Sequence, residues 1–260
     1  MTGSLLADLA AELLRAQRTH EPVSPISLRY PDLGLLDAYR IQELQAQAQT
    51  EEGRKLLGFK IGLTSAEAQK HFKLFHPDFG RLFDSMQLPS GGTCPLDSLI
   101  QPKIEGEIAF TLGADLLGPG LTLQDVILAV GTVRPALEII DSRIKDWKIA
   151  AVDTIADNGS SAYFVLGGNP KPLKGLELPF LGMAFSRNGE VVMTGSGGAV
   201  MGNPLEAVLF LGNELGKQGV PLKAGQVILS GAVSGVLPLE RGDTFEAEFL
   251  HLGSVSVRCG

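Results

Sequence analysis

The sequence predicts an α+β protein with a curled, mostly β core and a small helical region at its N-terminus. Residues 1–56 carry apolar side chains at helical spacing. Residues 57–260 contain eight short apolar runs separated by Gly, Pro and Asp, and only two long helical patterns interrupt them. The 32 glycines fit tight turns and closely approaching strands. We therefore expect a helical region over 1–56 and a β-rich domain over 57–260.

Two amphipathic helices form the expected N-terminal region. Residues 4–18 place five leucines near helical spacing, and residues 35–52 combine Tyr39 and Leu44 with several alanines. The proline-rich segment “EPVSPISLRYPDLG” lies between them and is expected to be a connector. The composition changes near residues 53–57, where we place the boundary.

The apolar runs that follow are expected to be strands. In chain order they are “LLGFKIGLT”, “IEGEIAFTL”, “RPALEIID”, “SAYFVLG”, “GMAFSRNGEVV”, “GQVILSG”, “DTFEAEFL” and “GSVSVRC”. Asn188-Gly189 within the fifth run predicts a tight hairpin turn.

Two helices are predicted between the strands. The segment “TLQDVILAVG” begins at Thr122 and carries Asp125 at the capping-box position. The segment “NPLEAVLFLGNELGKQG” begins at Asn203 and has Pro204 at the first helical position.

Composition excludes several classes of partner. A net charge of -7 gives no reason to expect nucleic acid or an anionic membrane surface, and no uncharged apolar run reaches the roughly 18 residues of a membrane span. The N-terminus lacks the basic segment of a signal peptide. Cys94 and Cys259 show no zinc spacing, and a reducing compartment suits them better than a disulfide. We expect a cytoplasmic protein.

Glu105 and Glu107 in “QPKIEGEIAF” pose the first question about chemistry. Side chains two apart in a strand share a face, so these like charges repel unless water or a cation lies between them. Glu246 and Glu248 in “DTFEAEFL” have the same spacing and are expected to be solvated. The pattern leaves both interpretations open for the first pair.

Glu138 in “ALEII” favours a metal site. A carboxylate within such an apolar run is costly to bury unless a partner neutralises it. Arg134 or Lys145 is one candidate partner, and a divalent cation is the other. Three carboxylates without a nearby histidine suit Mg²⁺ or Mn²⁺ rather than zinc.

Lys60 and Asp78 each have a structural and a functional interpretation. Lys60 in “GFKIGLT” is either an exposed edge-strand lysine or a buried acid–base group beside a metal. Asp78 in “HPDFG” is either a turn residue or a group that faces a site. The segment “DTIADNGSS” is expected to be a polar loop, which either faces solvent or lines a site.

The longer motifs identify a family. “GFKIGLTS”, “HPDFGRLFD”, “QPKIEGEIAFTL”, “PALEIIDSRIKDWK”, “DTIADNGSS” and “GQVILSGAVSG” occur in this order. Together they resemble the 2-keto-4-pentenoate hydratases, also called 2-hydroxypenta-2,4-dienoate hydratases, of the fumarylacetoacetate hydrolase superfamily. The similarity runs along the whole chain.

The resemblance implies a fold, a cofactor and a set of residues. The fold is a fumarylacetoacetase C-terminal-like mixed β roll or barrel, in which 57–260 is the catalytic domain. Glu105, Glu107 and Glu138 would hold Mg²⁺ or Mn²⁺, and Lys60 and Asp78 would face the substrate as acid–base candidates. We assign substrate binding to Ser160 and Ser161 in the polar loop. The resemblance also implies a homopentamer or homodecamer.

The implied activity is hydration of 2-hydroxypenta-2,4-dienoate to 4-hydroxy-2-oxopentanoate, in meta-cleavage degradation of aromatic compounds. Two related activities are alternatives: decarboxylation of 2-oxo-3-hexenedioate and hydration of 2-oxohept-3-enedioate. A catalytically silent binding relative is the non-enzyme alternative, which a missing metal carboxylate would favour. Superfamily hydrolases that cleave C–C bonds use a His-Glu dyad, and the scarcity of histidine, with only four in this chain, argues against that reaction.

Overall fold

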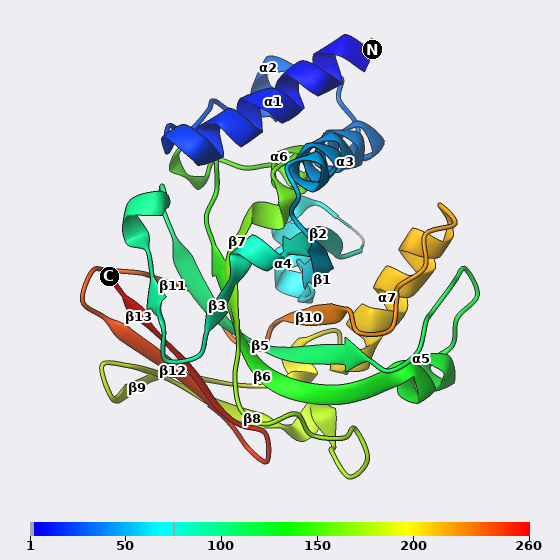
Figure 1. Cartoon of the computed structure of the whole chain (residues 1–260), viewed down its shortest axis with the longest axis vertical. Coiled ribbons are helices and arrows are strands. Elements are labelled where there is room, and N and C mark those ends of the chain that lie inside the picture. Colours follow the sequence, from blue (N-terminus) through cyan, green and yellow to red (C-terminus); the bar gives the residue numbers. More distant parts are fainter. Residues whose placement is uncertain (1–2, 75) are drawn as a thin grey trace.

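The computed structural model describes residues 3–74 and 76–260 (Figure 1). The helices are α1 (Gly3–Thr19), α2 (Ile26–Arg29), α3 (Leu35–Glu51), α4 (Ala66–Phe72), α5 (Leu123–Ala129), α6 (Ala151–Ala156) and α7 (Pro204–Gly216). The strands are β1 (Leu56–Gly62), β2 (Asp78–Phe83), β3 (Gln87–Pro89), β4 (Thr93–Cys94), β5 (Lys103–Leu112), β6 (Val130–Ile140), β7 (Ser161–Leu166), β8 (Gly182–Arg187), β9 (Glu190–Ser196), β10 (Val227–Ala232), β11 (Leu237–Pro238), β12 (Thr244–Phe249) and β13 (Gly253–Cys259).

The described strands form two sheets, and the expected α+β class with a curled β core is confirmed. The larger sheet has the order β2-β1-β10-β5-β6-β7-β3, with β11 paired to β5. The smaller has the order β4-β13-β12-β8-β9. The long strands β5 and β6 curve through the middle of the molecule, and the smaller sheet packs against one side of them (Figure 1).

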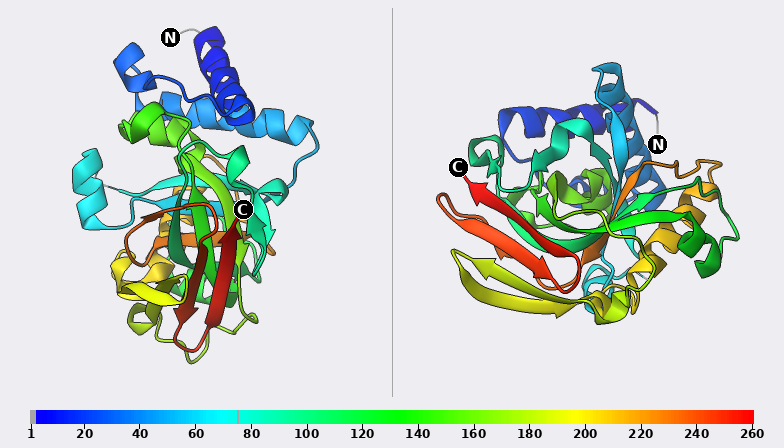
Figure 2. Two further views of the ribbon diagram at one scale, coloured as in Figure 1. Left: turned by 90° about the vertical axis from the view of Figure 1, so that its left-hand side faces the viewer. Right: turned by 60° about the horizontal axis from the view of Figure 1, so that its bottom comes forward.

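The helical region lies against one end of this β body. Helices α1 and α3 pack together there, and α3 also contacts α6 (Figure 2). Leu9, Leu13 and Ile41 share a buried cluster with Ile144 and Ile155 from the β-rich part. The two predicted helices are confirmed, while the connector between them contains the short helix α2.

One prediction of local structure differs from the structure, and another is confirmed. The segment “DTIADNGSS” is not simply a polar loop, since residues 151–156 form helix α6 and Asp153 is buried. Asp153, in the first turn of α6, stabilises the start of this helix, because its carboxylate accepts a hydrogen bond from the N–H of the N-cap residue Ala150 at 2.8 Å. The predicted hairpin turn is confirmed: Asn188 and Gly189 both have positive φ, at 55° and 85°.

Strand β5 is buried on both faces, which decides the character of the site. Ile104, Ile108 and Phe110 belong to the main core with Phe185 and Phe245 of the smaller sheet. The opposite face of β5 carries Glu105, Glu107 and Ala109, which are buried as well. Alternate residues of β5 therefore face two different interiors, and neither face of this strand is solvated over residues 104–110.

Strand β12 behaves as predicted for a half-buried strand. Its residues alternate between exposed and buried, with Glu246 and Glu248 exposed. The same Glu-x-Glu spacing therefore occurs once in a solvated strand and once in a buried one.

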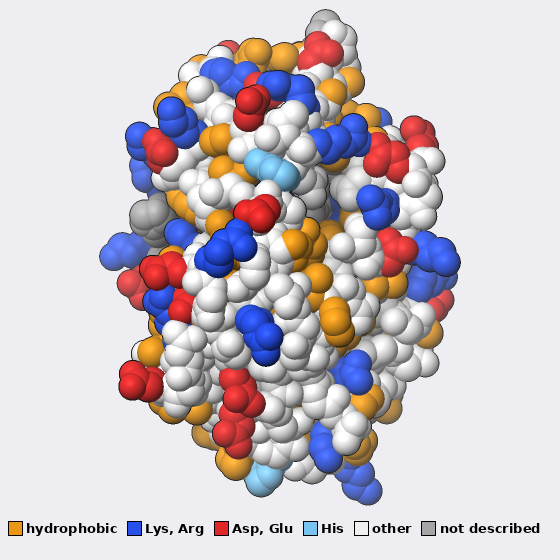
Figure 3. All heavy atoms as spheres, turned by 60° about the vertical axis from the view of Figure 1, so that its left-hand side comes forward, with side chains coloured by type: hydrophobic (Ala, Val, Ile, Leu, Met, Phe, Trp, Pro, Cys, Tyr) orange, Lys and Arg blue, Asp and Glu red, His pale blue; other side chains and the backbone are white. Residues whose placement is uncertain are grey.

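On the face shown in Figure 3, basic and acidic side chains are interspersed and form no large patch of one charge. Within the described residues, no helix has the length and apolarity that crossing a membrane requires. Cys94 and Cys259 are both buried free thiols.

Candidate metal and substrate site

Three buried glutamates meet on the inner face of the larger sheet. Glu105 is 8% exposed, and Glu107 and Glu138 are fully buried. Each offers one carboxylate oxygen, and these oxygens lie within 4.8 Å of one another. This arrangement is a candidate metal centre made only of oxygen ligands.

Strand register brings the glutamates together. Glu105 of β5 pairs directly with Glu138 of the antiparallel strand β6, so both side chains leave the same face of the sheet. Glu107 follows on that face because it is two residues from Glu105. The interpretation of Glu105 and Glu107 as a solvated pair is thus wrong, since both lie in an interior.

The cluster carries more negative charge than its surroundings neutralise. Burial, followed by the charge of Glu138, raises the pKa of Glu105 to about 7, although Lys60 opposes the shift. Burial and the neighbouring carboxylates also raise the pKa of Glu107 well above its usual range.

The unpaired oxygens of the cluster fit a bound cation. Oε1 of Glu107 and Oε1 of Glu138 are buried and have no hydrogen-bond partner. Buried polar atoms normally find a partner, and a hard divalent ion would supply one to both. The residues present therefore fit the metal that the sequence motifs imply.

The backbone of β10 fixes the position of Glu107. The Gly231 N–H donates to Oε2 of Glu107 at 2.6 Å. The β10–β5 register shifts between Leu229 and Ala232, and Gly231 has a φ of 98°. A Cβ at Gly231 would lie 2.5 Å from Oγ1 of Thr64, so both the conformation and the space there require glycine.

Lys60 lies beside the glutamates. It comes from β1, which pairs with both β2 and β10, so the edge-strand interpretation is wrong. Its side chain is buried, and Nζ lies 3.1 Å from Oε2 of Glu138. Burial alone would lower the pKa of Lys60, but Glu138 and the other carboxylates outweigh it and raise that pKa.

The proposed alternative partners of Glu138, Arg134 and Lys145, form no ion pair with it among the described residues.

Asp78 is the first residue of β2 and not a turn residue. It pairs with Gly62 across the β1–β2 ladder and is 1% exposed. Burial raises its pKa against the opposing charge of Lys60, and its Oδ1 atom has no hydrogen-bond partner. An unpaired carboxyl oxygen therefore lies in the neighbourhood of Lys60.

A left-handed turn at residues 158–160 closes the other side of Lys60. Asn158, Gly159 and Ser160 have φ values of 55°, 61° and 55°. Such a run is costly in an L-peptide and persists only where surrounding contacts enforce it. A Cβ at Gly159 would lie 2.8 Å from Cε of Lys60, so a glycine is needed for the lysine to pass.

Side chains hold this turn on both flanks. Asn158 pairs with the backbone of Arg81, accepting from its N–H at 2.7 Å and donating to its carbonyl at 2.9 Å. Arg143 donates through Nε to Asp157 at 2.5 Å and through Nη1 to the Ser161 carbonyl at 3.0 Å. The buried Arg143–Asp157 ion pair therefore fixes the residues that flank the turn.

The two candidate serines differ in position. Ser160 lines the cavity that contains Lys60, and its hydroxyl donates to Asp157 Oδ2 at 3.2 Å. Ser161 is buried but is not among the residues that line this cavity, and its hydroxyl has no hydrogen-bond partner.

A cavity of about 550 Å³ leads to these groups. It brings Lys60, Asp78, Glu105 and Ser160 together, as the sequence predicts. Sequence reasoning missed Lys103, Trp147, Thr64 and Glu67, which also line it. Lys103 could have been predicted to lie near the site, because it is two residues before Glu105 and therefore on the same strand face.

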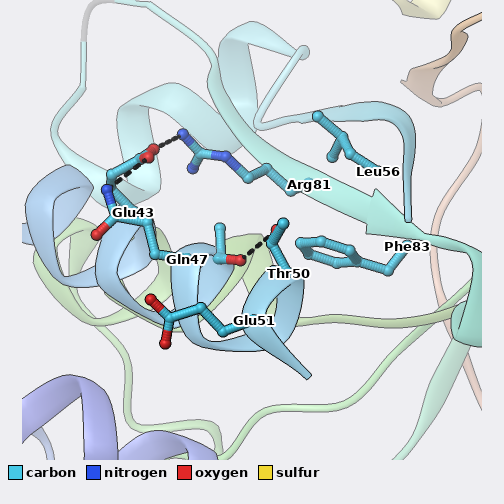
Figure 4. Close-up of a pocket in the computed structure, with 8 residues that line it drawn as sticks. Glu43, Gln47, Thr50, Glu51, Leu56, Arg81 and Phe83 are labelled. Atoms are coloured by element: carbon cyan, nitrogen blue, oxygen red, sulfur yellow. Dashed lines mark hydrogen bonds and ion pairs between the residues drawn. The ribbon is translucent and has the colours of Figure 1, made fainter. Parts of the chain in front are cut away.

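A second cavity of about 330 Å³ lies between α3 and the β1–β2 pair (Figure 4). Arg81 points at Glu43 there and forms an ion pair with it. Because this arginine is already paired, the second cavity offers no comparable reactive group.

Comparisons with known proteins find a matching family and similar enzymes. The family described as Fumarylacetoacetate (FAA) hydrolase C-terminal matches residues 70–259. The chain is 45% identical to a 2-keto-4-pentenoate hydratase of Paraburkholderia xenovorans, over 98% of this chain and 95% of that one. It is 42% identical to a 2-hydroxyhexa-2,4-dienoate hydratase of Comamonas testosteroni, over 95% and 93%.

A solved structure is similar as well. The 4-oxalocrotonate decarboxylase from Pseudomonas putida G7, complexed with magnesium and adipate, matches with a TM-score of 0.98 and 35% identity, and the match covers 100% of this chain and 99% of that one.

We predict that Glu107→Gln removes divalent-cation binding. The substitution deletes a charge from the cluster and leaves an amide facing Glu105 and Glu138. Titration of metal-free protein with Mn²⁺, followed calorimetrically, measures the effect. Glu246→Gln is the matched control, because it changes the exposed glutamate of the equivalent spacing and should bind Mn²⁺ as the wild type does. Equal loss in both variants would contradict this assignment.

Proposed function

This chain belongs to the fumarylacetoacetate hydrolase family, and from that premise we propose that it is a metal-dependent hydro-lyase. Its substrate is 2-hydroxypenta-2,4-dienoate, and its product is 4-hydroxy-2-oxopentanoate. The observation that carries the proposal is the buried cluster of Glu105, Glu107 and Glu138 beside Lys60, at a cavity that also contains Asp78. The full-length similarity to two dienoate hydratases supports the choice of reaction.

We propose Mg²⁺ or Mn²⁺ as the ion at the three glutamates, since a ligand set of carboxylates alone suits hard cations. Such an ion supplies electrostatic stabilisation of negative charge on the C2 oxygen of a 2-oxo acid. The related decarboxylase was solved with magnesium, which supports a divalent cation.

The chain's own residues supply proton transfer and shape. Hydration requires a proton at C5, loss of the enol proton, addition of water at C4 and a proton at C3. Lys60 is buried beside Glu138; burial lowers its pKa, but the surrounding carboxylates outweigh this effect and raise it. Asp78 holds a proton more readily than a surface aspartate because burial raises its pKa. These two groups are therefore the acid and base candidates.

The turn at residues 158–160 limits where the substrate can lie. Gly159 and Ser160 line the cavity next to Lys60, so a bound substrate is confined between this turn and Glu105. We propose that Ser160 binds the substrate or orders the attacking water. Ser161 stays a prediction for the same role, and its unpartnered hydroxyl is the observation that supports it.

Decarboxylation of 2-oxo-3-hexenedioate is the second candidate, because a 4-oxalocrotonate decarboxylase is 35% identical with a TM-score of 0.98.

A cytoplasmic location, assembly into a pentamer or decamer, and the division of the chain at residue 56 stay predictions of the sequence.

An assay of both substrates tests the proposed function. We expect the Mg²⁺- or Mn²⁺-loaded protein to consume 2-hydroxypenta-2,4-dienoate and form 4-hydroxy-2-oxopentanoate. Chelation should abolish this turnover, and adding back the metal should restore it. Release of CO₂ from 2-oxo-3-hexenedioate without hydration of the dienoate would replace the hydratase by the decarboxylase. Full activity in metal-free protein would refute the metal dependence.

We predict that Lys60→Met lowers kcat by about 10²–10⁴-fold, as expected for loss of an acid–base group. The variant should still bind oxalate in a metal-dependent way, because oxalate mimics the carboxylate and keto oxygen and needs no proton transfer. Lys55→Met, which changes an exposed lysine one residue before β1, is the control and should keep normal kinetics. Normal turnover by Lys60→Met would remove Lys60 from the mechanism.

A further inference from the structure

The cavity contains a second lysine that no carboxylate neutralises. Lys103 begins β5 and lies on the same strand face as Glu105, two residues away. Among the described residues it forms no ion pair, whereas the other lysine of the cavity, Lys60, lies 3.1 Å from Glu138. The Lys103 ammonium instead lies 4.1 Å from the centre of the Trp147 ring.

The position of Trp147 is built into the fold. Its φ is 53°, and that of Asp146 is 59°, which are unusual values for non-glycine residues and above all for a bulky one. The indole Nε1–H donates to the Gln101 carbonyl at 2.9 Å. The Gln101 side chain in turn donates to the carbonyls of Ser142 and Ile144 at 2.8 and 2.6 Å. This chain of hydrogen bonds therefore holds the ring in the cavity wall and offsets the cost of the unusual backbone conformation.

A ring face orients an ammonium without cancelling its charge. A cation–π contact leaves the lysine charged, and the N–H donors that point away from the ring can still bind an anion. Lys103 is thus a second fixed positive charge in a cavity whose lining also includes Lys60 and the acids Glu67, Asp78 and Glu105, and it is the lysine without a carboxylate partner among the described residues. An anionic ligand would be repelled by those acids unless a cation compensated for them.

We propose that Lys103, positioned by Trp147, binds a carboxylate group of the substrate. The proposal rests on the proposed function, since it takes the ligand to be a 2-oxo acid or its dienol. Two carboxylates could occupy this position: the C1 carboxylate that every such substrate carries, or the terminal carboxylate of a dicarboxylic substrate. The shared chemistry is a charge-assisted hydrogen bond from the lysine.

Binding experiments with two probes test the proposal. The affinity of Mn²⁺-loaded protein for 2-oxopentanoate, a monocarboxylate, and for 2-oxoadipate, a dicarboxylate, is measured calorimetrically. Trp147 is the single tryptophan of the chain, so its fluorescence gives a second readout at the proposed position. Lys103→Met keeps an unbranched side chain one atom shorter and removes its charge. Lys148→Met, which changes a 71% exposed lysine next to Trp147, is the matched control.

We expect Lys103→Met to weaken binding of at least one probe by about tenfold or more. Loss with both probes assigns Lys103 to the C1 carboxylate, and loss with 2-oxoadipate alone assigns it to the terminal carboxylate. Lys103→Arg should recover part of the affinity, whereas a merely structural role of Lys103 would give no such charge dependence. Wild-type affinity for both probes in Lys103→Met would overturn the proposal.

Failure of the proposed function would look different. If wild-type protein bound neither probe in the presence of Mn²⁺, the assignment of a 2-oxo acid substrate would fail, and Lys103 would lose its ligand with it. If wild-type protein bound both probes and Lys103→Met bound them equally well, only the role of Lys103 would be wrong.

Discussion

Four buried carboxylates face one neighbouring ammonium at the centre of this protein, and the rest of the site depends on that imbalance. Glu105, Glu107, Glu138 and Asp78 all lie in the interior, and Lys60 is the one cation that forms a close ion pair with them in the described residues. Leaving unpaired ionised groups in a low-dielectric interior costs several kcal/mol each after relaxation. Uptake of protons or of a divalent cation relieves this cost, and the unpaired oxygens of Glu107 and Glu138 favour the cation.

The fold contributes rigid placement to this cluster. Antiparallel pairing of β5 with β6 sets Glu105 opposite Glu138, and the irregular β10 backbone directs the Gly231 N–H at Glu107. On the opposite side, the left-handed turn at 158–160 confines Lys60 and is itself held by the Arg143–Asp157 pair. Strain in this turn and in Trp147 is concentrated around the cavity, as is usual where a site needs a fixed geometry.

The sequence predicted most of the elements and which charged residues the fold brings together, whereas the chemical roles of these residues stay predictions. Periodicity gave the two N-terminal helices and the alternation of β12, because each of these elements buries one face only. Periodicity failed at β5, where both faces are buried and Glu105 resembles the exposed Glu246 in pattern. The two strands differ in whether other parts of the protein cover their second face. That coverage depends on how the sheets pack in three dimensions and not on the local spacing of residues. The family motifs, rather than spacing, pointed to the strand whose glutamates the structure buries.

Other parts of the site depend on contacts that single-sequence reasoning does not reach. The burial of Lys60 follows from its place between β2 and β10, whereas the short strand alone allowed an exposed edge. Helix α6 replaced an expected polar loop because Asp153 caps it and also accepts hydrogen bonds from Ser27. Lys103 and Trp147 come together from segments about forty residues apart, and no local pattern indicated their contact.

Anomalous diffraction from crystals of this protein grown with Mn²⁺ tests the central claim most directly. The account predicts one strong manganese peak in contact with carboxylate oxygens of Glu105, Glu107 and Glu138, beside a Lys60 side chain that stays within reach of Glu138. A cluster without manganese, while Mn²⁺ binds elsewhere on the protein, would contradict the account. It would mean that protons alone relieve the buried charge.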